Sequence, residues 1–178
     1  ETPPGLTSFQ AATLLREARK ADRILAVGLN RRAIPLVRHV VERMRQLTPI
    51  TQVNGRFIKH GTAAFCAGAL SAFVSDSIHA VDLVRWIAGG TPVVAATIEQ
   101  QVGDEVPNAW NAIARFDNGV VGVIHASYMT GGRVHSLEIH GPGASAFVNL
   151  GFGDPACSAE LLVYGGGTSY SLAATGAL

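Results

Sequence analysis

The alternation of apolar and polar residues between residues 92 and 150 is the feature that most constrains the fold of this chain. A period of two is typical of half-buried strands, and short turn signals separate the segments. Strands are predicted at about 93–102, 109–117, 120–129, 133–140 and 145–150. Asp117-Asn118-Gly119 predicts the tightest hairpin, because Asn-Gly tolerates positive φ. These closely spaced strands indicate a large, mostly antiparallel sheet.

The residues before 92 show helical spacing instead. Thr7 and Gln10 form a capping-box pattern, and Gly89-Gly90 ends a long apolar segment where a left-handed cap costs little. The predicted helices cover about 8–21, a segment from Pro35 to Met44, and 72–88, and further strands are predicted at 24–29 and 50–58. Strand 24–29 is apolar on both faces, as in a parallel sheet covered by helices. The fold class is α+β, with an open sheet carrying helices on one face.

Both faces of the predicted sheet carry apolar residues. In the strand 109–117, Trp110 and Phe116 point to the same face. In the strand 120–129, Ile124 points to one face, and Val121 and Val123 point to the other. A sheet with one wet face alternates more cleanly. Charged residues make up only 15% of the chain, against roughly 25% in an average soluble domain. We expect a homodimer through this second face; coverage by the same chain is the alternative.

Composition excludes several classes of protein. The net charge is only +1, so the chain is not basic enough to be expected to bind nucleic acid. The longest uncharged apolar stretch, residues 60–75, is shorter than the ~20 residues that a membrane span requires. Glu1 to Gly5 is neither basic nor apolar, so no signal peptide is expected. Cys66 and Cys157 form no C-x-x-C pair, which fits neither a disulfide scaffold nor a zinc site, and the expected location is the cytoplasm.

Two glycine patterns, at 141–146 and 151–156, invite comparison with a dinucleotide-binding turn. Such a turn lies between a strand and a helix, whose amino end binds the pyrophosphate. The first pattern lies between two predicted strands, and the second contains Pro155. We interpret both as simple turns.

The densest polar cluster lies on the predicted helix 72–88. Ser75, His79 and Asp82 are spaced i, i+4 and i+7 and so share one face, with Asp76 beside them. A histidine with a pKa near 6.5 can exchange a proton with a substrate hydroxyl at neutral pH, and Asp82 could fix its tautomer. The alternative is a buried histidine bonded to a carbonyl, with Asp82 paired to Arg85.

Asn30-Arg31-Arg32 follows the predicted strand 24–29. Because ligands of open α/β sheets bind beyond the carboxyl ends of strands, this loop is a candidate substrate contact. The alternative is a solvated helix start. His135 and His140 differ by five residues and therefore point to opposite faces. No metal site is predicted.

Several of these segments together resemble the glucose–fructose oxidoreductase, inositol dehydrogenase and rhizopine-catabolism (Gfo/Idh/MocA) oxidoreductases. Glu1-Thr2-Pro3 is similar to the family's E-K-P, and Val27 to Arg32 to its V-G-F-x-R-R. Ser77 to Gly89 resembles its G-x-H-x-I-D-L-x-x-W-L-x-G helix, Phe116 to Gly122 its F-x-N-G-x-x-G hairpin, and Ile139 to Gly143 its I-x-G-x-x-G turn. The resemblance covers about residues 1–150.

The resemblance implies a two-domain enzyme that uses NAD or NADP on a sugar-like substrate. Residues 1–34 would be the tail of a nucleotide-binding domain that holds most of the cofactor, and 35–164 the substrate and oligomerisation domain. Residues 165–178 are Gly/Ser-rich, which independently predicts a flexible tail. His79 would be the catalytic acid or base, and Thr2 and Pro3 would contact the cofactor. The implied substrate contacts are Asn30, Arg31, Ser75 and His79.

Two positions depart from the family pattern. Thr2 stands where the family has a proton-transferring lysine, and Ser75 where it often has aspartate. These losses leave a second hypothesis open, a non-catalytic relative that serves as a dimerisation or ligand-sensing module. A third is a binding domain with no redox ancestry.

Overall fold

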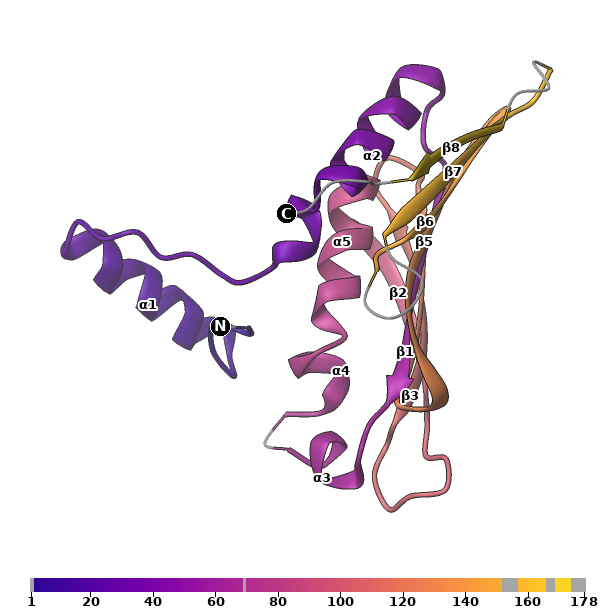
Figure 1. Ribbon diagram of the computed structural model, residues 1–178. Coiled ribbons are helices and arrows are strands. Elements are labelled where there is room, and N and C mark those ends of the chain that lie inside the picture. The colour runs from indigo at the N-terminus through magenta and orange to yellow at the C-terminus, as the bar shows by residue number, and fades with distance from the viewer. Residues whose placement is uncertain (1, 69, 152–156, 166–168, 174–178) are drawn as a thin grey trace.

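The computed structural model describes residues 2–68, 70–151, 157–165 and 169–173 as an α+β fold, with helices packed on one face of a curved sheet (Figure 1). The described strands are β1 (Gln52–His60), β2 (Pro92–Gln100), β3 (Ala109–Phe116), β4 (Val121–Ser127), β5 (Met129–Gly141), β6 (Ala144–Asn149), β7 (Ser158–Val163) and β8 (Ser169–Ala173). Their order in the sheet is β2-β3-β4-β1-β5-β6-β7-β8. Neighbouring described strands run antiparallel except β1 and β4, which are parallel. The predicted fold class is therefore confirmed.

In the chain, the described helices either precede β1 or lie between β1 and β2. They are α1 (Ser8–Lys20), the 3-10 helix η1 (Asn30–Ala33), α2 (Pro35–Leu47), α3 (Ala63–Cys66), α4 (Ala72–Ser75) and α5 (Ile78–Ala88). Helix α5 packs on β1 and β4, and α2 packs on β5, β6 and β7. Gly122 permits the close approach of α5, since a Cβ there would lie 2.7 Å from Val84 Cγ1. No helix in the described ranges is both long and apolar enough to cross a membrane.

Local sequence signals confirm several predicted boundaries. Thr7 and Gln10 form the predicted capping box at the start of α1. Gly89 ends α5 with φ +72°, and Gly119 turns the β3–β4 hairpin with φ +86°. Gly143, with φ +74°, lies in the β5–β6 turn, so the 141–146 glycine pattern is a hairpin as predicted.

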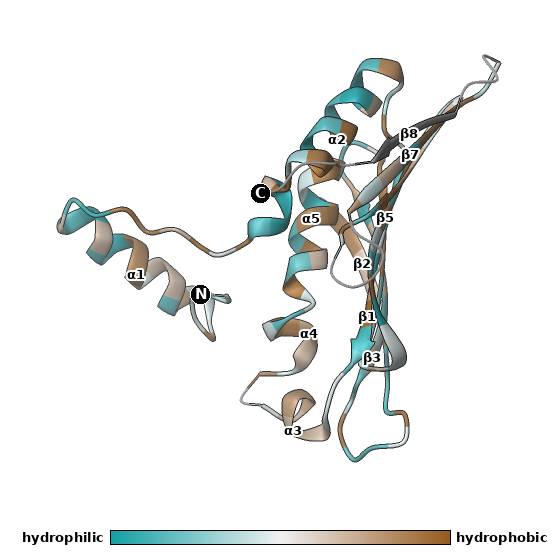
Figure 2. Cartoon of the chain, in the orientation of Figure 1, coloured by the Kyte–Doolittle hydropathy of each residue, from teal (hydrophilic) through white to brown (hydrophobic). Residues whose placement is uncertain are grey.

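The predicted strand at 24–29 is wrong. This segment has no secondary structure, and Ile24 is 97% exposed. Helix α1, which precedes it, has no buried residue and stands apart from the sheet (Figure 1). Figure 2 shows apolar residues along α1 and the linker. A strand needs a hydrogen-bonding neighbour, and no described segment pairs with this one.

Elsewhere the structure differs from the predictions or adds to them. The predicted continuous helix 72–88 breaks into α4 and α5 at Asp76-Ser77. Helix α3 and strands β7 and β8 were not predicted. Residues 169–173 of the predicted flexible tail form an edge strand, while 166–168 and 174–178 lie outside the described residues. Of the second glycine pattern, Gly151 has φ +72°, and 152–156 also lie outside them.

Candidate active site

A buried tyrosine explains the helix break beside His79. The Tyr128 hydroxyl lies 2.9 Å from Asp76 Oδ2, 2.8 Å from Ser77 Oγ and 3.1 Å from the Ala72 carbonyl oxygen. The Ser77 amide donates to the same Ala72 carbonyl, five residues back, which widens the turn. The Ala72 carbonyl thus accepts hydrogen bonds from the Asp76 and Ser77 amides and from the Tyr128 hydroxyl, and the Asp76 carboxylate is turned toward Lys59 of β1.

Lys59, near the carboxyl end of β1, is the cation that meets this carboxylate. Its Nζ lies 2.9 Å from Asp76 Oδ2, and the two side chains are only 18% and 30% exposed. The ammonium also lies 4.5 Å from the Phe65 ring centroid and 5.3 Å from that of Tyr128. Burial works to raise the pKa of Asp76, but the hydrogen bond and charge of Lys59 hold it below its usual value. Asp76 is therefore ionised at neutral pH.

His79 lies one turn after Asp76, and its backbone N–H donates to the Asp76 carbonyl over 3.2 Å. Its Nδ1 is buried and has no hydrogen-bond partner among the described residues. Burial and then the positive charge of Arg31 lower the pKa of His79, while Asp76 acts in the opposite direction. A neutral imidazole with an unused ring nitrogen can accept a proton from, or donate one to, a bound molecule.

The predicted site residues do not all come together. Arg31, in η1, is half-buried. Its positive charge interacts with Asp76 and lowers the pKa of His79. Asn30 is exposed. The Ser75 hydroxyl donates to the Ser71 carbonyl within its own helical turn, over 3.2 Å. The predicted shared face of Ser75 and His79 assumed a continuous helix, which the break removes.

Asp82 has neither of its predicted partners. Its carboxylate accepts two hydrogen bonds from Arg32 of η1, with Arg32 Nε 2.9 Å from Asp82 Oδ2. No described hydrogen bond joins it to His79 or Arg85. Arg32 was expected to contact substrate or solvent, but this ion pair with Asp82 instead links η1 to α5.

Thr2 and Pro3 are half-buried near the chain start. Among the described contacts, no hydrogen bond links either residue to His79. Their role toward a cofactor stays a prediction.

Sequence reasoning missed Lys59 and Tyr128, and it assigned no role to His135. His135, on β5, is 3% exposed and stacks on Phe57 with ring centroids 4.4 Å apart. Burial and then the charges of Arg133 and Arg31 lower its pKa to about 4. We call Arg31, Lys59, Asp76, His79 and Tyr128 the His79 cluster. Of the missed residues, Lys59 carried a sequence signal, because it directly follows the predicted strand 50–58, and ligands of open α/β sheets bind beyond the carboxyl ends of strands.

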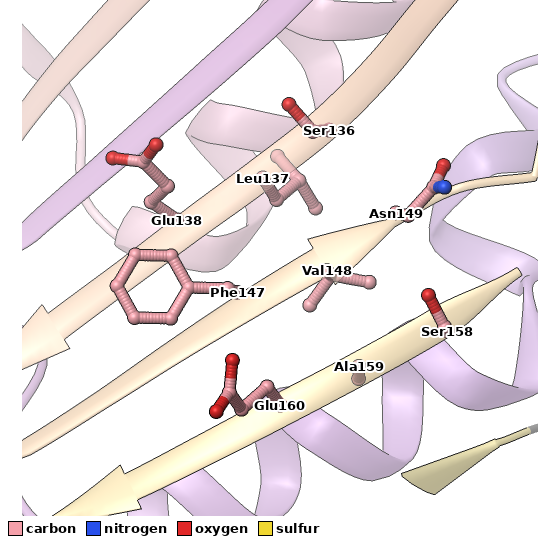
Figure 3. Close-up of a pocket in the computed structure, with 9 residues that line it drawn as sticks. All are labelled: Ser136, Leu137, Glu138, Phe147, Val148, Asn149, Ser158, Ala159 and Glu160. Carbon is pink, nitrogen blue, oxygen red and sulfur yellow. The ribbon is translucent and has the colours of Figure 1, made fainter. Parts of the chain in front are cut away.

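The opposite, open face of the sheet has a different character. A groove of about 600 Å³ runs over β5, β6 and β7, and the polar side chains along it include Glu138 and Glu160 (Figure 3). It lies on the side of the sheet away from the His79 cluster. As predicted, His135 and His140 take opposite faces: His140 pairs with Ser145 on the open side. No group of three potential metal ligands occurs in the described part of the chain.

Comparison with known proteins reveals similar sequences and folds. Residues 39–147 match the GFO/IDH/MocA C-terminal domain. No curated protein sequence matches the chain. Among solved structures, UDP-N-acetylglucosamine 3-dehydrogenase from Acidithiobacillus ferrooxidans superposes with a TM-score of 0.82 at 17% identity, over 97% of this chain and 55% of that one.

Two further structures are similarly close in fold. Aldose–aldose oxidoreductase from Caulobacter crescentus, complexed with glycerol, has a TM-score of 0.79 at 14% identity, over 96% of this chain and 53% of its own. An oxidoreductase from Agrobacterium radiobacter, in complex with NAD+, L-tartaric acid and magnesium, has a TM-score of 0.76 at 16% identity, over 96% and 52%. The chain thus spans about half the length of these structures.

Proposed function

The chain belongs to the GFO/IDH/MocA C-terminal domain family, and from that premise we propose that it is the substrate-binding and dimerisation domain of an NAD(P)-dependent oxidoreductase. The proposed reaction interconverts a hydroxyl and a ketone on a sugar or polyol. The observation that carries the proposal is the buried Nδ1 of His79, which has no hydrogen-bond partner in the described part of the chain and lies beside the Lys59–Asp76 pair. A buried polar atom without a hydrogen bond lowers the stability of the fold. A ligand that forms a hydrogen bond with this nitrogen would remove that cost.

His79 is the proposed acid or base. In the oxidative direction, its neutral imidazole accepts the proton of the substrate hydroxyl while the carbon gives up a hydride. A nicotinamide cofactor, when bound, supplies the hydride acceptor. In the reverse direction, the imidazolium returns the proton to the carbonyl oxygen. Arg31 and Ser75, with Asn30, are the proposed substrate contacts, and of these the half-buried Arg31 has the strongest support.

The described residues do not fit a dinucleotide by themselves. The glycine turn at 141–146 joins two antiparallel strands and offers no helix amino end to a pyrophosphate. We propose that residues 1–34 pack against a nucleotide-binding domain of the same protein, with Thr2 and Pro3 near the cofactor. Exposed apolar side chains of this segment support the proposal: Phe9 is 73% exposed and Ile24 97%.

The substrate class is supported by what similar structures are named for. One is a dehydrogenase of a nucleotide sugar and another an aldose oxidoreductase, and a third contains NAD+. Their identities to this chain are below 20%, so they support a sugar or polyol without selecting one, and leave the choice between NAD and NADP open.

Dimerisation through the open face is the second part of the proposal. Large apolar side chains are exposed there, among them Ile98 at 68%, Ile113 at 51% and Leu162 at 40%. Their strand neighbours on the helix side, such as Phe116 and Leu161, belong to the core. Such a surface is typical of an interface between subunits.

The experiment is a turnover assay with the longer protein to which we assign this chain. The purified protein is mixed with NAD+ or NADP+ and a panel of aldoses, cyclitols and sugar acids, and formation of reduced nicotinamide is followed. The proposal expects turnover with at least one member. If the protein binds panel members but reduces no cofactor, the chain is a ligand-sensing module. If it neither binds nor turns over any, the sugar assignment is wrong.

A further inference from the structure

Lys59 is a charged residue of the His79 cluster to which the proposed function assigns no role. Its ammonium can donate three hydrogen bonds. Among the described residues, Asp76 is its one hydrogen-bond acceptor, at 2.9 Å. The aromatic faces of Phe65 and Tyr128 stabilise the positive charge but accept no conventional hydrogen bond. Donor capacity therefore remains on an ammonium that is 18% exposed.

The surroundings hold this ammonium in one place. Asp76 Oδ2 accepts from both Lys59 and the Tyr128 hydroxyl, and Tyr128 is 1% exposed. Asp76 also connects Lys59 to His79, because its backbone carbonyl accepts a hydrogen bond from the His79 N–H. A hydrogen-bond donor that is already held in place contributes more to ligand affinity than a mobile one, because less side-chain entropy is lost on binding.

We propose that Lys59 is a substrate-binding residue that donates a hydrogen bond to a substrate oxygen next to the position that reacts at His79. This inference rests on the proposed function, since it takes His79 as the reacting end of the site. The acceptor is a hydroxyl or carboxylate oxygen of a polyhydroxy compound. Asp76 acts as a positioning residue, because it orients Lys59 and does not itself touch the substrate.

The test uses the two lysines of the sequence, Lys20 and Lys59. The chain is isotope-labelled at lysine Cε and histidine Cε1, and NMR spectra are recorded during titration with glycerol, L-tartrate or succinate. Lys20, on the surface of α1, is the internal control. Lys59 and His79 are expected to shift together with glycerol or L-tartrate while Lys20 stays unchanged. A shift of Lys59 with glycerol indicates a hydroxyl acceptor, and one with L-tartrate and succinate but not glycerol a carboxylate acceptor.

Two other outcomes separate this inference from the proposed function. If His79 shifts and Lys59 does not, Lys59 only stabilises the helix break, and the inference fails while the function stands. If neither shifts with any of the three probes, the inference fails together with the assignment of polyol binding to this site. Lys59→Met should weaken the affinity for the active probe about 10- to 100-fold. Lys20→Met should leave that affinity unchanged, and equal affinities for the two variants would overturn the inference.

Discussion

Replacement of Tyr128 by phenylalanine removes a single oxygen atom from the centre of the His79 cluster. The ring remains, with its edge-on contact to Trp110 at 5.9 Å between centroids. What disappears is the hydroxyl that lies within 3.1 Å of Asp76, Ser77 and the Ala72 carbonyl. The site is 1% exposed, so water cannot readily replace the lost bonds.

The expected loss of stability follows from the hydrogen bonds that a hydroxyl can make at one time. Tyr128 donates one proton, and its oxygen can accept from Ser77. A bond to a charged acceptor contributes roughly 2 kcal/mol and a neutral one about 1 kcal/mol, so the sum is about 3 kcal/mol. For a chain of this size, such a loss lowers Tm by roughly 6–12 °C. Asp76 keeps Lys59 as a partner, which prevents a larger loss.

The assay is thermal unfolding followed by circular dichroism, with Tyr164→Phe as the matched control. Tyr164 is 92% exposed, and its substitution should change the free energy of unfolding by less than about 0.5 kcal/mol. Equal Tm values for the two variants would refute the reasoning, because the Tyr128 hydroxyl would then contribute nothing to the helix break.

Two other predictions concern the two faces of the sheet. Because burial and then the charge of Arg133 lower the pKa of His135 to about 4, its neutral form is favoured on folding, and stability falls as pH decreases from its ordinary pKa of 6.5 toward 4. The full loss is on the order of 3 kcal/mol, of which about 2 kcal/mol falls between about pH 7 and about pH 5. Urea unfolding at these two pH values should find this difference reduced in His135→Phe. On the open face, light scattering should give a dimer mass for the native protein and a monomer mass for Ile113→Asp, because the interface would bury an unpaired carboxylate. A native monomer would exclude the proposed interface.

Signals contained within a few residues predicted much of the fold. The Asn118-Gly119 turn, the Thr7 cap and the left-handed Gly89 depend on local backbone preferences, and all three occur as predicted. Period-two alternation located β3 to β6, which bury residues of one face against the helices. It also located β2, although every residue of that strand is exposed in the structure.

Features decided by distant partners were not predictable in this way. Residues 24–29 are apolar enough for a strand, but strand formation requires a neighbour that the described chain does not provide. The break before α5 is caused by Tyr128, about fifty residues further along the chain, so a regular helix was the natural expectation. The same break brings Asp76 to Lys59, and this pairing cannot be read from spacing.

The central claim is that His79 transfers the proton in a nicotinamide-linked oxidation, and its substitution tests this most directly. In the turnover assay, His79→Asn should lower kcat about 10²- to 10⁴-fold, with the affinity for the nicotinamide cofactor unchanged. His39→Asn, at an exposed histidine on α2, should behave as the native protein does. If His79→Asn retains native kcat, His79 is not the acid or base, and the account of this site is wrong.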